Sequence, residues 1–329
     1  MSAAGLHDRF LRRINYLRLS ITDRCNLRCT YCMPPEGVHA LDHSSILSYE
    51  EMLRVARTAV ALGIEKIRIT GGEPLVRRGV VQFVARIGAL PGLRDLSLTT
   101  NGLLLADAAD DLRRAGLRRV NVSLDTLRPD VFERITRRQG LDRVLAGLAR
   151  ARSVGLSPIK VNVVAIKGVN DSEILDFAAF AQREGYEVRF IEFMPSAATA
   201  WDTSQVLTAA QVLEVLSSRY TLQPADNGAA AGPSRSFLLP GGGRVGVISP
   251  LSDHFCGSCN RLRLTAEGRL RSCLFSQEET DLRPLLRESD SDAGLVEAIR
   301  SAVQRKPEGH TIGEDGQHKC GLSMSRVGG

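Results

Sequence analysis

Three cysteines near the start of the chain, Cys25, Cys29 and Cys32, are spaced closely enough to bind one metal centre. A [4Fe–4S] cube usually takes four thiolates, so a cube held by three would keep one iron open for a small molecule. Structural zinc sites instead favour pairs of closely spaced ligands and a filled tetrahedron. The spacing C-x3-C-x2-C therefore favours an iron–sulfur cluster over zinc, and over three unrelated buried thiols.

A second group of three cysteines lies near the other end of the chain, at Cys256, Cys259 and Cys273. It is again one thiolate short of four. A structural zinc site is the alternative, and its fourth ligand would be one of three residues: His254, His318 or Cys320. Arg261 and Arg263 follow closely after Cys259, where a zinc site has no use for them but a substrate phosphate would pair with them. We therefore expect a second iron–sulfur cluster beside a phosphate-binding site.

The composition limits the class of protein. The 329 residues suffice for one large domain or two unequal ones, and the formal net charge of +6 favours an anionic partner. Aromatic residues make up only 5% and are not interleaved with a basic run, so we expect a small anionic substrate rather than nucleic acid. No apolar stretch approaches the roughly 20 residues that span a bilayer, and no secretory segment opens the chain. Seven cysteines, mostly clustered, indicate thiolates in a reducing compartment and hence a cytoplasmic protein.

Strand-like and helix-like segments alternate between residues 17 and 193. The predicted strands are Leu17–Thr22, Lys66–Thr70, Asp95–Thr100, Arg119–Leu124, Ile159–Ala165 and Glu187–Phe193. The predicted helices are Tyr49–Leu62, Val80–Leu90, Asp107–Ala115, Leu141–Val154 and Ser172–Glu184. Such alternation builds a parallel sheet, because each crossover returns the chain to the same edge. The sequence therefore predicts an α/β fold, either an open doubly wound sheet or a partial (β/α) barrel, with ligands beyond the carboxyl ends of the strands.

Polar or glycine-rich residues follow each predicted strand, where that rule places the ligands. They are the loop of Cys25, Gly71-Gly72-Glu73-Pro74, Asn101-Gly102, Asp125, Lys167-Gly168 and Met194-Pro195. The pair Gly71-Gly72 lets a ligand approach the backbone, because glycine has no side chain. Glu73 adds a carboxylate at the same edge. The alternative is a tight turn into a helix whose dipole Glu73 complements.

The regular alternation ends near residue 195. A further helix is predicted over Thr208–Arg219, and a β-hairpin over Ser236–Leu239 and Arg244–Ser249. A short helix is expected near Leu295–Val303. We therefore predict a larger domain over residues 1–219 that carries the first cysteine group, and a smaller one over residues 220–329 that carries the second.

The cysteine loop, with Tyr31 before its last cysteine, and the Gly-Gly-Glu motif together resemble the radical S-adenosylmethionine (SAM) enzymes. From Leu17 to its last residue the chain resembles one family of them in particular, the GTP 3′,8-cyclases, which open molybdenum cofactor biosynthesis. The matching stretches are Arg18–Cys25, Lys66–Pro74, Leu98–Gly102, Val120–Asp125, Lys160–Val163, Arg189–Met194, the second cysteine group and Gly328-Gly329. The resemblance implies a partial (β/α)6 barrel of the TIM type with a smaller C-terminal domain, and one [4Fe–4S] cluster in each.

The resemblance also implies roles for individual residues. The metal ligands would be Cys25, Cys29, Cys32, Cys256, Cys259 and Cys273. The SAM contacts would be Tyr31, Gly72, Glu73, Ser123 and Met194. The GTP contacts would be Arg18, Arg68, Thr99, Lys160, Arg189 and Arg261-Leu262-Arg263, with Arg18, Lys160 and Arg189 also acting in catalysis. Without the resemblance, Ser123 would be an ordinary strand residue, Met194 a core residue and Arg68 one member of a strand face.

The activity implied by the resemblance is a lyase reaction that converts GTP to (8S)-3′,8-cyclo-7,8-dihydroguanosine 5′-triphosphate. SAM at the first cluster would yield a 5′-deoxyadenosyl radical that takes hydrogen from C3′ of GTP, while the second cluster holds the purine. The implied partners are an electron donor of the flavodoxin or ferredoxin type and cyclic pyranopterin monophosphate synthase, the next enzyme of the pathway, for a protein that is a monomer or homodimer. The resemblance also implies that Gly328-Gly329 reaches the active site.

Three other functions are compatible with parts of the sequence. Another radical SAM enzyme with an auxiliary cluster, for example one that modifies peptides, would share both cysteine groups, but Arg261 and Arg263 favour a phosphorylated substrate. An electron carrier of the ferredoxin type would not need six strand–helix units. A zinc-stabilised nucleotide-binding protein would lack the broad visible absorption of an iron–sulfur cluster.

Overall fold

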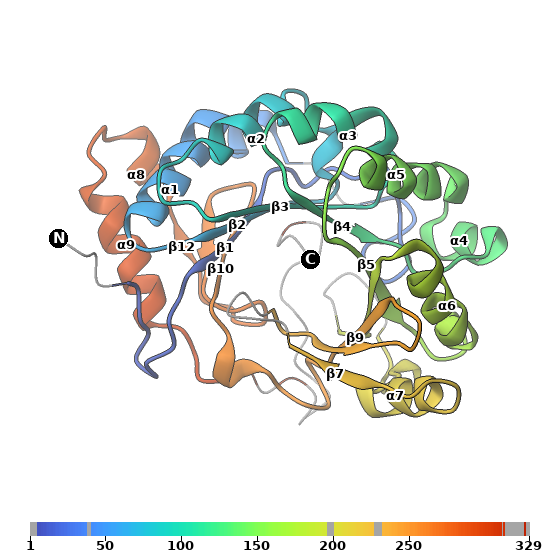
Figure 1. Ribbon diagram of the computed structural model, residues 1–329. Coiled ribbons are helices and arrows are strands. Elements are labelled where there is room, and N and C mark those ends of the chain that lie inside the picture. The colour runs from blue at the N-terminus through green and yellow to red at the C-terminus, as the bar shows by residue number, and fades with distance from the viewer. Residues whose placement is uncertain are drawn as a thin grey trace.

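The computed structural model describes residues 5–37, 41–195, 201–226, 232–310, 312 and 326. Within them the chain forms one twelve-stranded sheet, in the order β12-β11-β10-β1-β2-β3-β4-β5-β6-β9-β8-β7. The strands are β1 (Tyr16–Ser20), β2 (Lys66–Thr70), β3 (Asp95–Thr100), β4 (Arg119–Ser123), β5 (Ile159–Ala165), β6 (Glu187–Glu192), β7 (Gln223–Ala225), β8 (Arg235–Leu238), β9 (Arg244–Ile248), β10 (Arg261–Leu264), β11 (Arg269–Arg271) and β12 (Thr280–Asp281). The sheet curls into an open barrel with helices around its outside (Figure 1). This architecture confirms the α/β class and selects the partial barrel.

Strands β1 to β6 form the parallel core of the barrel. Leu17 of β1 pairs with Ile67 of β2, and Ile67 with Leu96 of β3, and the same parallel pairing continues to β6. Every residue of β1 and β2 is buried, because one face of the sheet meets the helices and the other meets the interior. The predicted strands of this region agree with the observed ones to within two residues at each end.

The helices pack on the outer face of this core. They are α1 (Tyr49–Ala61), α2 (Val80–Gly88), α3 (Leu105–Arg114), α4 (Pro129–Thr136), α5 (Leu141–Ser153), α6 (Ile174–Glu184), α7 (Ala209–Ser217), α8 (Arg283–Arg287) and α9 (Ala293–Gln304), with 3-10 turns η1 (His43–Ser45), η2 (Pro74–Val76), η3 (Asp171–Glu173), η4 (Thr203–Gln205) and η5 (Cys256–Ser258). Capping boxes begin α1, at Ser48 and Glu51, and α7, at Thr208 and Gln211. The short helices α4 and α8 were not predicted. Within the described ranges, no helix combines the length and the apolar character needed to cross a membrane.

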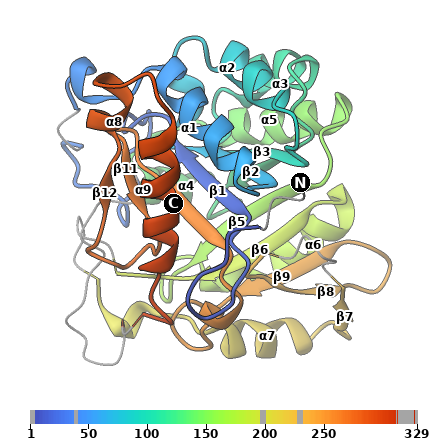
Figure 2. The same ribbon diagram turned by 90° about the vertical axis from the view of Figure 1, so that its left-hand side faces the viewer.

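The C-terminal part of the chain extends both edges of the parallel core. Strand β9 pairs with β6, and β8 then pairs with β9 in the predicted hairpin. At the opposite edge β10 pairs in parallel with β1, and α9 lies on the same side of the molecule (Figure 2). Both cysteine groups are thereby brought to one barrel. Because both parts contribute strands to one sheet, the domain boundary between residues 219 and 220 stays a prediction.

Candidate active site

The first cysteine group lies in the loop after β1, and α4 holds this loop in place. The backbone N–H of Arg28 donates to the carbonyl of Thr136, the last residue of α4, over 3.0 Å. The guanidinium of Arg137 donates to the carbonyls of Arg28 (2.9 Å) and Met33 (3.1 Å). These bonds fix the backbone on both sides of the second and third cysteines, so the unpredicted helix α4 is a direct support of the candidate cluster site.

All three thiols of this loop are half-buried and line one cavity of about 190 Å³. The Sγ atom of Cys25 accepts hydrogen bonds from the backbone of Leu27 (3.4 Å) and from Nδ2 of Asn101 (3.8 Å). Burial raises the pKa of Cys29 well above its usual value, and the neighbouring Cys32 raises it further. Three thiolates that face one cavity repel one another unless a cationic centre lies between them, so this donor set fits a metal cluster.

The Gly-Gly-Glu turn packs directly against the start of the cysteine loop. The N–H of Gly72 donates to the carbonyl of Thr22 over 2.7 Å, and that of Glu73 to the carbonyl of Arg24 over 2.8 Å. A Cβ atom added at Gly72 would lie 2.4 Å from the carbonyl oxygen of Arg24. Glycine is therefore required here for the approach of two backbone segments, in addition to any ligand.

Glu73 itself points away from the cavity. Its carboxylate is fully buried and accepts hydrogen bonds from the backbone of Leu75 (2.9 Å), the hydroxyl of Thr100 (2.9 Å) and the backbone of Asn101 (2.6 Å). Burial raises the pKa of Glu73 to about 7, although these three donors oppose the shift. Glu73 thus joins the Gly-Gly-Glu turn to the end of β3 and places Asn101, which reaches Cys25.

Tyr31 is held by Asp125, which lies two residues after β4, at the edge where ligands are expected. Its hydroxyl donates to Asp125 over 2.6 Å, and the other oxygen of Asp125 accepts from the backbone of Val164 over 2.8 Å. Burial raises the pKa of Asp125 to about 6. Asp125, Asn101 and Asn162 all line the first cavity. The position of Asp125 and Asn101 just after strands predicted that they lie at this edge, but not that they contact Tyr31 and Cys25.

The second cysteine group lines a cavity of about 150 Å³ beside β10 and β11. Cys256 begins the turn η5, Cys259 directly follows it, and Cys273 lies two residues after β11. Burial alone would raise the pKa of Cys259, but the charges of Arg261 and Lys306 and hydrogen bonds from Arg261 lower it to about 6. The thiolate that metal binding requires is therefore favoured at this position.

The two cavities adjoin inside the barrel. Asn162 of β5, Ile191 of β6 and Met194, two residues after β6, line both of them. The two cysteine groups therefore open toward a common boundary, although more than two hundred residues separate them in the sequence.

Buried arginines make up much of the wall of the second cavity. Arg263, Arg18 and Arg68 occupy the same register on β10, β1 and β2, and Arg189 joins them from β6. Burial lowers the pKa of Arg18 well below its usual value, with repulsion from Arg263 as the next cause. Burial also lowers the pKa of both Arg189 and Arg263 to about 10. Asn162 accepts two hydrogen bonds from Arg189 (3.0 and 2.7 Å). So many buried cations in one wall favour an anionic ligand.

Most residues predicted from the sequence lie on these two walls. The first cavity contains Tyr31, Gly72, Thr99, Ser123 and Met194, and the second contains Arg18, Arg68, Arg189, Arg261, Arg263 and Met194. Three predicted residues lie elsewhere. Glu73 does not line the first cavity but is hydrogen-bonded to Asn101, which does. Leu262 belongs to the hydrophobic core, and Lys160 lines a third cavity.

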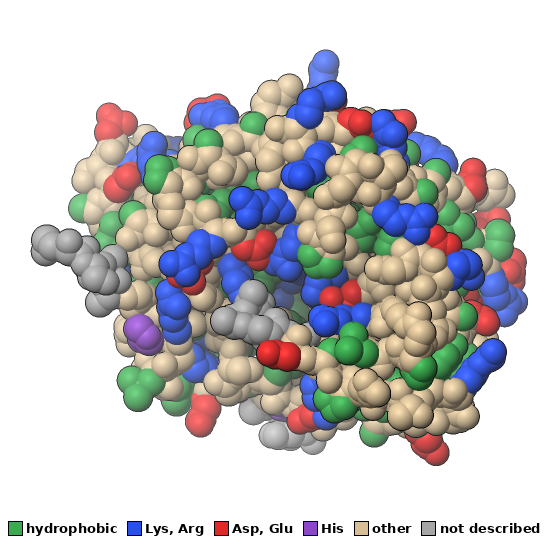
Figure 3. Space-filling model, viewed as in Figure 1, with side chains coloured by type: hydrophobic (Ala, Val, Ile, Leu, Met, Phe, Trp, Pro, Cys, Tyr) green, Lys and Arg blue, Asp and Glu red, His purple; other side chains and the backbone are tan. Residues whose placement is uncertain are grey.

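The third cavity, of about 480 Å³, lies at the amino ends of the strands. Arg119, Lys160 and Arg244 line it with Glu187, which pairs with Lys160 over 2.8 Å. Arg189 lines both this cavity and the second one, so a basic surface connects them. On the face shown in Figure 3, Lys and Arg side chains gather around a central hollow.

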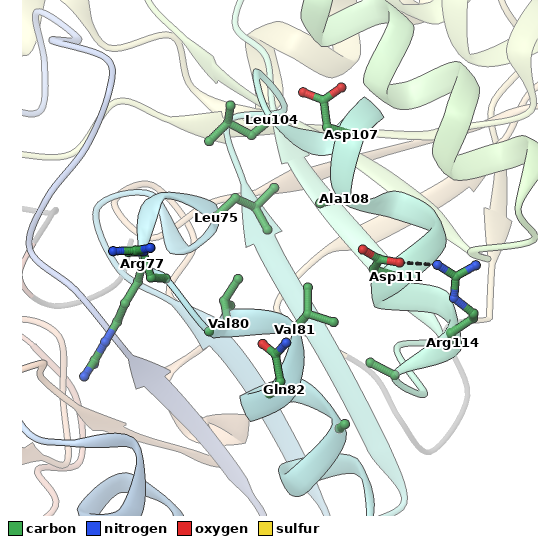
Figure 4. Close-up of a pocket in the computed structure, with 14 residues that line it drawn as sticks. Leu75, Arg77, Val80, Val81, Gln82, Leu104, Asp107, Ala108, Asp111 and Arg114 are labelled. Atoms are coloured by element: carbon green, nitrogen blue, oxygen red, sulfur yellow. Dashed lines mark hydrogen bonds and ion pairs between the residues drawn. The ribbon is translucent and has the colours of Figure 1, made fainter.

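A larger hollow, of about 750 Å³, lies on the outside of the barrel beside η2, α2 and α3 (Figure 4). Apolar side chains such as Leu75 and Val81 line it together with the ion pair of Arg114 and Asp111. No residue predicted to bind a ligand lines this hollow, so the chemistry belongs to the interior of the barrel.

In the part of the chain that the structure describes, no group of three His, Cys, Asp or Glu side chains forms a single-ion site. Each cysteine group brings three thiols to one cavity, one fewer than the four ligands of a structural zinc site. His318, Cys320 and the Gly328-Gly329 end lie outside the described residues.

The barrel, with a three-cysteine loop at the carboxyl ends of its strands, defines a protein of the radical SAM class. The family model described as the Radical SAM superfamily matches residues 19–181, and the one described as Molybdenum Cofactor Synthesis C matches residues 186–312. The crystal structure of Streptococcus suis SuiB bound to S-adenosylmethionine has the same fold, with a TM-score of 0.59 and 16% identity over 88% of this chain and 68% of that chain.

Two curated relatives are much more similar in sequence. A GTP 3′,8-cyclase of Geobacter sulfurreducens is 55% identical over 98% of this chain and 99% of its own length. A GTP 3′,8-cyclase of Syntrophomonas wolfei is 46% identical over 98% of this chain and 99% of its own length. The chain belongs to the GTP 3′,8-cyclase family, which confirms the resemblance found in its motifs.

Proposed function

We propose that this protein converts GTP to (8S)-3′,8-cyclo-7,8-dihydroguanosine 5′-triphosphate, the first step of molybdenum cofactor biosynthesis. Its family membership supports this reaction, at 55% identity to a GTP 3′,8-cyclase. In the structure, the supporting observation is that the cavities of the two cysteine groups share Asn162, Ile191 and Met194. One cavity suits the group that generates a radical and the other suits a nucleoside triphosphate, so the reacting atoms would meet at the shared boundary.

The first cavity would hold SAM and the [4Fe–4S] cluster that the radical SAM superfamily implies. Cys25, Cys29 and Cys32 would ligate the cluster, which together with SAM supplies a radical able to remove a hydrogen atom. The proposed SAM contacts are Tyr31, Gly72, Ser123 and Met194, all on this wall. Glu73 would act indirectly, because its hydrogen bonds place Asn101 against the cluster loop.

The second cavity would hold GTP beside a second [4Fe–4S] cluster on Cys256, Cys259 and Cys273. The low pKa of Cys259 and the position of all three thiols on one cavity wall support this proposal. The proposed GTP contacts on this wall are Arg18, Arg68, Arg189, Arg261 and Arg263, while Lys160 would be reached through the adjoining third cavity. Thr99 would lie near the boundary, on the first wall.

The chain's own residues would mainly position the reactants and exclude water. The triphosphate exchanges the repulsion between Arg18, Arg263 and their neighbours for charge-assisted hydrogen bonds. A bound triphosphate would therefore offset the repulsion between Arg18 and Arg263. Ile191 and Met194 place apolar side chains at the boundary between the two cavities. Such side chains would exclude water from the radical formed there.

Several finer assignments rest on the family alone. We propose classification as a lyase, an electron donor of the flavodoxin or ferredoxin type, and cyclic pyranopterin monophosphate synthase as the enzyme that receives the product. The location in the cytoplasm also stays a prediction from the clustered cysteines.

The experiment that tests the function combines cluster analysis with product analysis under anaerobic conditions. Replacing Cys25, Cys29 and Cys32 by Ala should abolish SAM cleavage and leave about half of the iron, because separate cubes assemble on separate ligands. As a matched control, replacing Cys256, Cys259 and Cys273 by Ala should also leave about half of the iron but preserve SAM cleavage, without cyclised product. Retained cleavage in the first variant, or loss of all iron in either, would contradict the proposal.

A further inference from the structure

Lys306 is a buried lysine that touches the backbone beside two cysteines of the second group. Its side chain is 2% exposed, and its Nζ donates to the carbonyl of Arg261 over 3.0 Å and to the carbonyl of Ser272. The first carbonyl lies two residues after Cys259, and the second directly precedes Cys273. One ammonium group therefore joins the two strands β10 and β11 at the points where the cysteines leave them.

The residues that follow Lys306 are linked through Arg12 to Cys256, the remaining cysteine of the group. Arg12 donates to the carbonyl of Cys256 (2.7 Å), to that of Glu308 (2.7 Å) and to that of Pro307 (2.5 Å). The backbone of His310 also donates to the thiol of Cys256. The segment from 306 to 310 thus contacts Cys256 and the backbone beside Cys259 and Cys273, and Lys306 supplies its positive charge.

The position of Lys306 separates it from the arginines that we assign to GTP. Arg261 and Arg263 line the second cavity, whereas Lys306 does not. Its ammonium instead interacts electrostatically with Cys259 and Cys273. A cube bound by three thiolates carries a net negative charge, and a buried negative charge needs a compensating partner. A fixed cation behind the thiolates supplies that charge without occupying the substrate's place.

We infer that Lys306 is a positioning residue for the second cluster: it sets the separation of Cys259 from Cys273 and compensates the negative charge of the cube. This inference rests on the proposed second cluster. It has two consequences that substrate binding alone would not produce. Loss of the ammonium should reduce cluster assembly, and it should make any remaining cluster harder to reduce, because reduction adds negative charge at the same place.

The test uses a chain in which Cys25, Cys29 and Cys32 are replaced by Ala, so that all bound iron belongs to the second group. Into this background we would introduce Lys306→Met, which keeps the length of the side chain but removes its charge and its donors. Arg305→Met is the matched control, because Arg305 is the exposed neighbour, bonded to Ser301 and Thr280 rather than to the cysteine strands. The readouts are iron and sulfide per chain after anaerobic reconstitution, a redox titration of the cluster, and thermal melting of the metal-free protein.

We expect Lys306→Met to bind at least threefold less iron than the background, or to keep the iron at a more negative reduction potential, while Arg305→Met changes neither. Equal iron and equal potential in all three proteins would overturn the inference. A metal-free Lys306→Met protein that melts well below the control would also overturn it, since the lysine would then be a general support of the fold. Failure of the background itself to bind iron would instead refute the second cluster, and with it that part of the proposed function.

Discussion

Replacing Gly72 by Ala should displace the start of the first cysteine loop. The new Cβ would lie 2.4 Å from the carbonyl oxygen of Arg24 and 2.8 Å from that of Asp23, whereas ordinary contacts begin at 3.4 Å. The backbone must therefore move by about 1 Å, and no flexible side chain can absorb the shift. The bonds from Gly72 to Thr22 and from Glu73 to Arg24 cross this contact and would be stretched.

Overpacking in a close contact costs about 1–3 kcal/mol, and weakening one or two hydrogen bonds adds about 1 kcal/mol. We therefore expect the free energy of unfolding to fall by about 2–4 kcal/mol. The displaced carbonyl of Arg24 belongs to the residue before Cys25, so the variant should also assemble less of the first cluster.

The assay is urea unfolding of the reduced, metal-free protein, followed by iron analysis after reconstitution. Gly88→Ala is the control, because a Cβ at this position in α2 has its nearest neighbours at 3.5 Å, and alanine there should be neutral or stabilise by up to about 1 kcal/mol. A Gly72→Ala protein with unchanged stability and full iron would refute the packing argument. Normal stability with weaker SAM binding would show that the glycine serves the ligand alone.

Three further outcomes are expected. Arg263→Met should weaken GTP binding, measured by calorimetry, by about 1.5–3 kcal/mol, the value of a charged hydrogen bond. It should not lower the melting temperature of the ligand-free protein, because it removes repulsion from Arg18. A lower melting temperature would mean that Arg263 stabilises the fold. The pKa of Glu73 is about 7 in the folded protein, above its ordinary value of 4.5, so between pH 4.5 and pH 7 the folded state binds more protons than the unfolded state. The free energy of unfolding therefore falls as the pH rises through this range, by up to about 3 kcal/mol. Urea unfolding across this range should show that fall reduced in Glu73→Gln, and identical pH profiles would contradict the assignment. Deleting Gly328 and Gly329 should leave iron content and melting unchanged but stop cyclisation, and full activity in the truncated protein would refute the role predicted for this end.

Local patterns were sufficient for the core of the fold and for the cysteines. The strands β1 to β6 follow from short apolar segments between amphipathic helices, and each cysteine group lies within a span short enough to recognise. The helix α4 was missed because it has only eight residues, although Pro129 at its first turn is a typical helix start. The strands β7, β11 and β12 were missed because they are only two or three residues long.

Contacts between distant segments could not be predicted from the sequence. The row formed by Arg263, Arg18 and Arg68 exists only because β10 returns to pair with β1, and no local pattern encodes that pairing. The role of Glu73 as a support of Asn101 depends in the same way on the packing of two loops. Lys306 gave no signal at all, since a lysine just after the end of a helix is most often exposed.

The pairing of β1 with β10 also has a consequence for synthesis of the protein. The side chain of Asn260 donates to Asn15, which precedes it by 245 residues, so one edge of β1 waits for a partner until most of the chain has been made. Until then β1, whose residues are all buried in the finished protein, has one unpaired edge. Unpaired strand edges of this kind are sites at which incompletely folded proteins aggregate. Closure over so long a separation is also expected to be slow. The first cysteine group is therefore made long before the second half of the active site exists.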